Sequence, residues 1–238
     1  MTRVRIASIY PTLLGTYGDG GNVMALSHIA ALHGIDVEVL NIDPGMTVPA
    51  DADIYVLGGG EDTAQVAAAN ALRASGALQS AVADGAAVLA ICAGYQVLGH
   101  EFPDATGVMA QGLGLLDVRT DRLPKRAVGE LVAVPSPEVG LGFTELFTGY
   151  ENHGGATHLG TGAKPLATVS SGIGNGDGTE GAISGRVIGT YLHGPCLVRN
   201  PHLAERLLGW AVGKDLEHIT EDAVAALRRD RLDLAARG

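Results

Sequence analysis

Cys92 stands in a sequence context that suits a catalytic nucleophile. An apolar run at residues 86–91 precedes it, and Ala90 and Gly94 lie two positions on either side. Small residues at these positions are typical of a sharp strand-to-helix turn that lifts a nucleophile into an exposed, strained position. Unpaired N–H groups and the dipole of a helix N-terminus favour a thiolate. The spacing therefore favours a nucleophilic thiol over the alternative, a buried core cysteine.

A cysteine nucleophile needs a general base, and His193 is the first candidate among eight histidines. It follows an apolar run at residues 187–191, and ligands of open parallel sheets bind at the carboxyl ends of the strands. Cys92 and His193 would then meet at one edge of a sheet. His153 is the rival base, but the glycine-rich segment around it predicts a loop that holds the side chain less firmly. The sequence near Cys92 lacks the spacing of metal ligands, so no metal site is expected.

A glycine-rich turn at residues 58–60 follows another apolar run. It lacks the spaced glycines of a dinucleotide-binding turn and the lysine of a P-loop, so we expect no ATP or NAD site in this chain. The backbone N–H groups of Gly59 and Gly60, together with that of Ala93, would instead stabilise an oxyanion beside the thiol. A purely structural turn is the alternative.

These candidates depend on strands and helices that hydrophobic periodicity predicts. In the first half, strands alternate with helices, which indicates βαβ units around a buried parallel sheet. From about residue 115 the strands become shorter, and residues 172–178 (GIGNGDG) predict a mobile turn. No repeat or linker interrupts the chain, so one domain is expected. The predicted strands are residues 4–10, 35–40, 54–57, 86–91, 131–134, 167–170 and 187–191, and the predicted helices are residues 22–32, 63–83, 201–212 and 221–234.

Composition narrows the class of protein and its partners. Of 238 residues, 46% are hydrophobic and 35 are glycine, which is typical of a globular protein with many tight turns. A formal net charge of −10 argues against nucleic acid or an anionic membrane as the main partner and favours a neutral or zwitterionic small molecule, or another protein. Two distant cysteines and no long apolar segment lead us to expect a cytoplasmic protein without a disulfide framework or membrane insertion.

Four motifs follow one another along the chain: residues 58–62 (GGGED), 90–96 (AICAGYQ), 149–155 (GYENHGG) and 189–195 (GTYLHGP). In this order they resemble the motifs of the class I glutamine amidotransferases of the cobyric-acid-synthase-like branch. Asn152 and residues 16–22 (TYGDGGN) look like the GatD group, the glutaminase subunits of lipid II isoglutaminyl synthase. The resemblance extends over about residues 4–215. It implies an α/β, class I glutamine amidotransferase-like (flavodoxin-like) fold, with a mixed, mainly parallel sheet flanked by helices, and a single glutamine amidotransferase domain over residues 1–238.

The resemblance implies a role for each candidate residue. Cys92 would attack the side-chain amide of L-glutamine, and His193 would protonate the departing ammonia and then activate water to hydrolyse the glutamyl thioester. Ala93 and a glycine of residues 58–60 would form the oxyanion hole. Arg126 lies where the GatD group places its glutamine-binding arginine, and a guanidinium can pair with an α-carboxylate through two hydrogen bonds. The residues alone leave three other cations equally plausible: Arg119, Arg122 and Lys125.

The resemblance also implies a partner. A MurT-type, Mur-ligase-like subunit would form a heterodimer with this chain, bind ATP and Mg²⁺, and use the ammonia to amidate the α-carboxyl of D-glutamate in lipid II to D-isoglutamine. This chain would hold no cofactor and would reach lipid II through the partner. One alternative is an amidotransferase subunit for another acceptor, such as a cobyrinic-acid-type ligase. A non-catalytic regulatory subunit and a cysteine peptidase are two further alternatives.

Two positions depart from the family pattern. Pro195 stands where many relatives carry a glutamate two residues after the histidine, so a Cys–His dyad is expected, with Asp19 or Glu151 as candidates for orienting the imidazole. Ala156 stands where the related branch often has an arginine, so no substrate contact is carried over to it. Cys196 is expected to be a packing residue.

Overall fold

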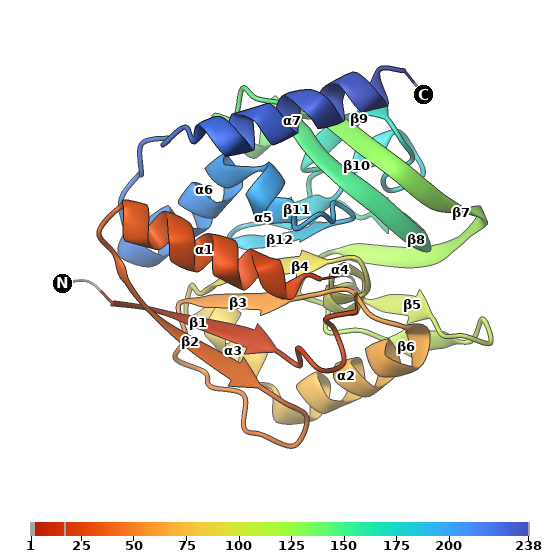
Figure 1. Cartoon of the computed structure of the whole chain (residues 1–238). Helices are drawn as coiled ribbons and strands as arrows, with labels where there is room; N and C mark the ends of the chain where they lie inside the picture. The colour runs from red at the N-terminus through yellow and green to blue at the C-terminus, as the bar shows by residue number, and fades with distance from the viewer. Residues whose placement is uncertain (1–2, 17, 238) are drawn as a thin grey trace.

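The computed structural model describes residues 3–16 and 18–237, which form two β-sheets and the helices around them (Figure 1). The first sheet has six strands in the order β11-β12-β4-β3-β1-β2. The strands from β12 to β2 are parallel and β11 is an antiparallel edge strand, as expected for a mixed, mainly parallel sheet. The strands are β1 (Arg3–Ile9), β2 (Asp36–Ile42), β3 (Ile54–Leu57), β4 (Ala87–Ile91), β11 (Ala182–Ser184) and β12 (Val187–Thr190).

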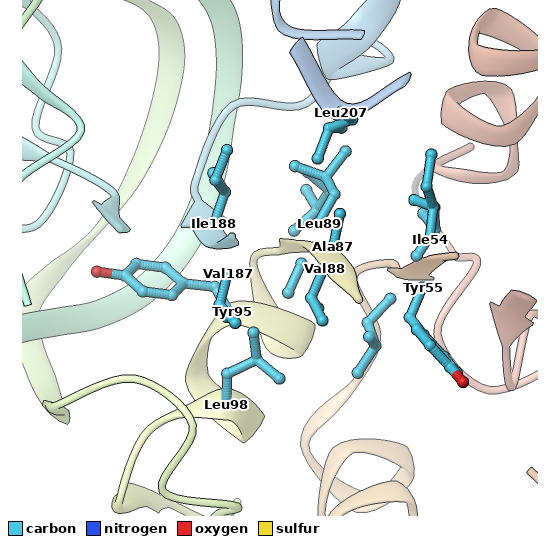
Figure 2. Close-up of a cluster of buried hydrophobic side chains, with 14 of the residues drawn as sticks. Ile54, Tyr55, Ala87, Val88, Leu89, Tyr95, Leu98, Val187, Ile188 and Leu207 are labelled. Carbon is cyan, nitrogen blue, oxygen red and sulfur yellow. The ribbon is translucent and has the colours of Figure 1, made fainter. Parts of the chain in front are cut away.

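Helices cover both faces of this sheet, which explains why its central strands are continuous apolar runs. Every residue of β3, β4 and β12 is buried. In Figure 2, Leu207 and Leu98 lie on opposite sides of these strands. Helices α1 (Gly20–Leu32), α5 (Cys196–Arg199) and α6 (Pro201–Val212) lie on one face, and α2 (Asp62–Ser75), α3 (Ala77–Ala83) and α4 (Ala93–Leu98) lie on the other (Figure 1).

The long helix predicted for residues 63–83 is in fact two helices, α2 and α3. Gly76 separates them with a left-handed backbone, at a φ of 63°, and its N–H donates to the Leu72 carbonyl at 3.1 Å. Such a residue ends an α-helix, and glycine adopts this conformation without steric penalty. Apolar residues continue on both sides of Gly76, so periodicity alone did not reveal the break.

The second sheet is mostly antiparallel and contains two long strands, one far longer than the strand predicted at residues 131–134 and one that was not predicted. Its order is β10-β9-β7-β5-β6, and β8 pairs with β7. Helix α7 (Asp222–Ala235) lies against β7 and β8 (Figure 1), and Pro137–Val139 form a short 3₁₀ helix. The strands are β5 (Glu101–Pro103), β6 (Met109–Gln111), β7 (Val118–Pro135), β8 (Phe147–Leu159), β9 (Ala167–Ser171) and β10 (Thr179–Glu180).

Strand β8 corrects the expectation that His153 lies in a loop. His153 is paired with Ala127 of β7 in an antiparallel ladder, next to an irregularity between Arg122 and Ala127. From Gly149 on, the side chains that β8 buries are polar or small, because these positions include Glu151, His153, Gly155 and Thr157. Strand formation here depends on pairing with β7 rather than on an apolar alternation, so the hydrophobic pattern does not show it.

The parallel sheet brings the predicted site residues to one edge. Cys92 follows β4 directly, and His193 lies three residues after the end of β12. Residues 58–60 follow β3, and the segment after β1 leads to Asp19 at the start of α1. Because these strands are parallel, their carboxyl ends share one edge of the sheet, where ligands of such folds bind.

A buried carboxyl group supports the end of β12. One oxygen of Glu180 accepts hydrogen bonds from the Thr190 hydroxyl and, at 2.9 Å, from the Tyr191 N–H. Its other oxygen, Oε2, has no hydrogen-bond partner among the described residues. Burial raises the pKa of Glu180 from 4.5 to about 7. The folded protein therefore binds a proton here that the unfolded chain releases, and the resulting stability is complete below pH 4.5 and lost as pH rises through 7.

Glu180→Gln removes this titration while keeping an acceptor for Thr190 and Tyr191. Between pH 5 and pH 8, we expect wild-type protein to lose about 2 kcal/mol of unfolding free energy relative to the variant. Urea denaturation at both pH values measures the difference. Glu217→Gln, at an exposed position, is the control and should follow wild type. Identical pH dependence in Glu180→Gln and wild type would contradict the assignment.

Candidate active site

Cys92 joins β4 to α4 in a conformation that few residues adopt. Its φ is 53° and its ψ is −108°, and the residue is 6% exposed. A positive φ outside glycine costs on the order of 1–3 kcal/mol and is commonly retained at functional sites. The Cys92 N–H donates to the carbonyl of Thr190, the last residue of β12, at 2.9 Å. Cys92 therefore occupies the strained strand-to-helix turn that the spacing predicts.

Gly94 shows why this turn needs small residues. A Cβ atom at Gly94 would lie 2.8 Å from the Leu57 Cβ and 2.9 Å from the Gly58 carbonyl oxygen. The Gly94 N–H donates to that carbonyl at 3.1 Å. The turn is thus packed directly against the end of β3, which places the glycine turn at residues 58–60 beside the start of α4.

His193 is oriented by a buried carboxylate. Its Nδ1 lies 3.2 Å from Asp19 Oδ1, and both residues are less than 5% exposed. The His193 backbone is also fixed, because its N–H and carbonyl both pair with Tyr150 of β8 at 3.0 Å. With Nδ1 bound to Asp19, Nε2 is the ring nitrogen left to exchange a proton with the Cys92 sulfur.

The surroundings of His193 favour its charged form. Burial by itself would lower the pKa, but hydrogen bonds to Asp19 and Cys92 and the charges of both groups outweigh it and raise the pKa from 6.5 to about 10. At neutral pH this raised pKa favours the imidazolium form of His193. This raised pKa adds stability that is complete below pH 6.5 and is lost as pH rises through about 10.

The position of Asp19 depends on close packing between α1 and Pro195. A Cβ atom at Gly21 would lie 2.2 Å from Pro195 Cγ, so only glycine allows the helix to sit so near. Asp19 is the N-cap residue of α1, yet its side chain makes no capping bond and instead reaches His193 and the Gly59 N–H. The carboxylate at the N-cap of α1 thus contacts the imidazole, while the position two residues after His193 is Pro195. Tyr17, in the same motif, lies outside the described residues.

Glu151 and His153, the other candidates, belong to a separate buried cluster. The Glu151 carboxylate accepts N–H groups of Ile173 and Gly174 at 2.8 and 2.9 Å, and lies 3.4 Å from His153 Nε2. The His153 ring stacks on Tyr191 with centroids 3.6 Å apart. Glu151 therefore anchors the turn predicted at residues 172–178, and the carboxylate that accepts the hydrogen bond of the His193 ring is that of Asp19.

The three predicted oxyanion donors are in different situations. The Gly59 N–H donates to Asp19 Oδ2 at 2.7 Å, so it is already engaged. The N–H groups of Gly60 and Ala93 donate no hydrogen bond to any residue that the structure describes. Gly60 and Ala93 thus remain the candidates for binding an oxyanion.

Arg126 lines a polar cavity of about 270 Å³. Its guanidinium donates to Asn152, at 2.7 Å to the side-chain oxygen and 3.2 Å to the carbonyl. Of the other cations that the sequence left open, Arg122 also lines the cavity, whereas Arg119 pairs with Glu101 and Asp121. Lys125 is not a lining residue. The full lining is Asp62, Gln96, Pro103, Arg122, Leu123, Arg126, Gly154 and Gly155.

Gln96 connects this cavity to the nucleophile. It lies one helical turn after Cys92, and its N–H donates to the Cys92 carbonyl at 3.1 Å. Its side-chain amide accepts a hydrogen bond from Gln65 at 2.8 Å and donates to the Tyr191 hydroxyl at 3.1 Å. Sequence analysis did not single out Gln96. Its place at the end of the AICAGYQ motif, four residues after Cys92, was the signal that could have identified it.

The remaining predicted features have simple places in the structure. Cys196 is fully buried in α5, and burial raises the pKa of its thiol, as expected for a packing residue. Within residues 3–16 and 18–237, no group of three or more His, Cys, Asp or Glu side chains is arranged to hold a metal ion. In the same ranges, no helix has the length and apolarity needed to cross a membrane.

A strained cysteine at a strand-to-helix turn and an imidazole at the neighbouring strand end are an arrangement typical of thiol enzymes built on an α/β sheet. Residues 5–201 match the CobB/CobQ-like glutamine amidotransferase domain, and the chain belongs to this family. This confirms the resemblance that the four motifs indicated.

Sequence relatives include two GatD subunits of lipid II isoglutaminyl synthase (glutamine-hydrolyzing). The chain is 34% identical to that of Streptococcus pneumoniae over 218 residues, 89% of this chain and 82% of the relative. It is 36% identical to that of Staphylococcus aureus over 197 residues, 82% of this chain and 79% of the relative. Cobyric acid synthase of Sphingopyxis alaskensis is 35% identical over 209 residues, but the match covers 40% of that protein.

Solved structures confirm the fold. A crystal structure of a glutamine amidotransferase aligns with a TM-score of 0.57 at 20% identity, over 87% of this chain and 98% of the other. A glutamine amidotransferase from Thermotoga maritima aligns with a TM-score of 0.56 at 15% identity, over 98% of this chain and 90% of the other. The class I glutamine amidotransferase-like fold is therefore shown.

Asp19→Asn tests whether the carboxylate orients and charges His193. An amide at this position can offer N–H to Nδ1, which stabilises the wrong tautomer, and it removes the charge that raises the pKa of His193. We expect kcat for glutamate release from glutamine to fall about 100-fold and the alkaline limb of its pH profile to move below pH 10. Exposed Asp36→Asn is the control. An unchanged kcat and pH profile in Asp19→Asn would show that Asp19 does not act on His193.

Proposed function

We propose that this chain is the glutaminase subunit of an enzyme that amidates lipid II, working through Cys92 and His193. The observation that carries the proposal is the pairing of a strained, buried Cys92 with an imidazolium at His193 that Asp19 holds. The GatD relatives support the choice of reaction, since their names describe glutamine-hydrolyzing subunits of lipid II isoglutaminyl synthase.

The chemistry follows from these positions. The Cys92 thiolate attacks the side-chain amide carbon of L-glutamine, and the oxyanion binds the N–H groups of Gly60 and Ala93. The His193 imidazolium gives its proton to the departing nitrogen, which leaves as ammonia, and a glutamyl thioester remains on Cys92. The neutral imidazole then takes a proton from water, the resulting hydroxide attacks the thioester, and glutamate and the thiolate are released.

Substrate binding is assigned to the cavity beside α4. Arg126 would hold the α-carboxylate of glutamine, because a guanidinium presents two parallel N–H groups to a carboxylate. Its bonds to Asn152 keep the guanidinium in place before substrate arrives. Since Gln96 joins the cavity to the first turn after Cys92, the side-chain amide of the substrate would extend toward the thiol.

The ammonia would pass to a MurT-type ligase subunit in a heterodimer. That partner would bind ATP and Mg²⁺, activate the α-carboxyl of D-glutamate in lipid II and form D-isoglutamine for peptidoglycan synthesis. The glycine turn at residues 58–60 supports this division of labour, because the Gly59 N–H donates to Asp19 and so is not open to a phosphate. The reaction would take place in the cytoplasm, with lipid II reached through the partner.

A second candidate acceptor of the ammonia is compatible with the same class of enzyme. Cobyric acid synthase is as similar in identity, so a cobyrinic-acid-type ligase is the alternative partner. The GatD proteins are matched over 82% and 79% of their lengths and cobyric acid synthase over 40%, which favours lipid II as the acceptor.

Cys92→Ser tests the function in the two-subunit enzyme. We measure glutamate release by this chain with and without the candidate MurT-type ligase, and amidated lipid II formed by the pair from glutamine and ATP. The variant should lose glutamate release by at least about 1,000-fold, because serine is a far weaker nucleophile here. With ammonium chloride in place of glutamine, the variant pair should still amidate lipid II.

Cys196→Ala is the matched control, since it removes the other cysteine and should keep activity within about threefold of wild type. No amidated lipid from the wild-type pair, or an undiminished rate from glutamine in Cys92→Ser, would refute the proposed function. Activity only with a cobyrinic-acid-type acceptor would select the alternative.

A further inference from the structure

Helix α7 buries a cation where a surface helix ordinarily buries apolar side chains. Among residues 222–235, all of which the structure describes, Arg228 is the only buried residue. A charged side chain is rarely buried without partners, because removing its charge from water costs free energy. The partners of Arg228 therefore indicate what α7 is placed to hold.

The guanidinium of Arg228 binds the carboxyl end of α5. It donates to the carbonyl of Arg199, the last residue of that helix, and at 3.3 Å to the side-chain oxygen of Asn200. Its other terminal nitrogen donates to the Leu146 carbonyl at 2.9 Å and lies 3.1 Å from a carboxylate oxygen of Glu145. Because α5 has only four residues, it is too short to be stable alone and depends on contacts of this kind. Arg228 thus joins α5 to the segment before β8.

The side chain of Arg199 extends from α5 to the turn that carries His193. A Cβ atom at Gly194, the residue after His193, would lie only 2.7 Å from Arg199 Cδ, so the Arg199 side chain packs directly against that backbone. The Arg199 guanidinium donates to the Thr148 hydroxyl at 3.2 Å and to the Glu130 carboxylate. A displacement of Arg199 would therefore displace the backbone directly after His193.

Helix α7 also contacts the side chain of Arg199 through Glu130. One oxygen of the Glu130 carboxylate accepts a hydrogen bond from Arg199, and the other oxygen lies 3.6 Å from the guanidinium of Arg231. Arg231 follows Arg228 by three positions, so both lie on one face of α7. The helix therefore holds both the backbone and the side chain of Arg199.

We propose that Arg228 is a positioning residue of the active site, which holds α5 and thereby the turn that carries His193. The inference rests on the proposed glutaminase function and extends it to a helix that lies after residues 5–201, the part of the chain that matches the family domain. Tyr150 and Asp19 hold His193 itself. Arg228 holds the segment that follows, and it acts on the reaction through α5 without touching the substrate.

Arg228→Ala tests this role in the complex with the candidate ligase. We expect kcat for glutamate release to fall about 10- to 100-fold, because a displaced His193 transfers protons poorly. The KM for L-glutamine should stay within about twofold, because the described residues that line the cavity assigned to glutamine all lie before residue 156 and outside α7. Loss of folded protein would also lower the apparent kcat, so a second measurement is needed.

Guanidinium chloride at millimolar concentration separates the two causes. A guanidinium ion can fill the space left by the missing side chain and donate to the same oxygens, so it should raise the kcat of Arg228→Ala several-fold. Sodium chloride at the same concentration should not. Guanidinium destabilises folded proteins, so a variant with a folding defect alone would lose activity instead.

Arg229→Ala is the matched control, because it removes the same side chain from the next, exposed position of α7. It should keep the wild-type kcat and show no response to guanidinium. An unchanged kcat in Arg228→Ala, a change of KM instead of kcat, or a loss that guanidinium does not restore would show that the inference is wrong. No glutamate release by the wild-type enzyme would refute the proposed function itself, and this inference with it.

Discussion

The buried carboxylate of Asp19 is the contact on which the geometry of the site depends. One oxygen binds Nδ1 of His193, 174 positions away in the chain, and the other accepts the Gly59 N–H. A single group thereby connects the segment after β1 to the ends of β12 and β3. A carboxylate held by two donors in a buried site favours the imidazolium, and it fixes which ring nitrogen faces the thiol. Close contact between Gly21 and Pro195 sets α1 at the depth that this contact requires.

The strain at Cys92 is stabilised by the same edge of the sheet. Its N–H pairs with the end of β12, and Gly94 pairs with the end of β3, so two neighbouring strands hold a backbone conformation that costs free energy on its own. Because Gly94 and Gly21 have no Cβ atom, these elements can approach closely. Two of the 35 glycines thus allow close packing around the thiol, whereas the net charge of −10 has no structural explanation here.

Sequence reasoning predicted the parallel sheet and the elbow because both depend on local patterns. Continuous apolar runs identify β3, β4 and β12, and small residues on both sides of Cys92 identify the turn. Strand β8 was not predicted because its buried positions hold Glu151, His153 and Thr157, which follow no apolar alternation. The choice between Asp19 and Glu151 depends on contacts between distant segments, and no local pattern records them.

The most direct test of this account is covalent labelling by 6-diazo-5-oxo-L-norleucine, a diazoketone analogue of glutamine. The diazo carbon would take a proton from the His193 imidazolium, and the Cys92 thiolate would then displace dinitrogen to form a thioether, which peptide mass spectrometry locates. We expect one label per chain on Cys92, protection by L-glutamine, and no label on buried Cys196. A label elsewhere, or labelling of Cys92 that L-glutamine does not slow, would contradict the claim that Cys92 is the nucleophile of a glutamine site.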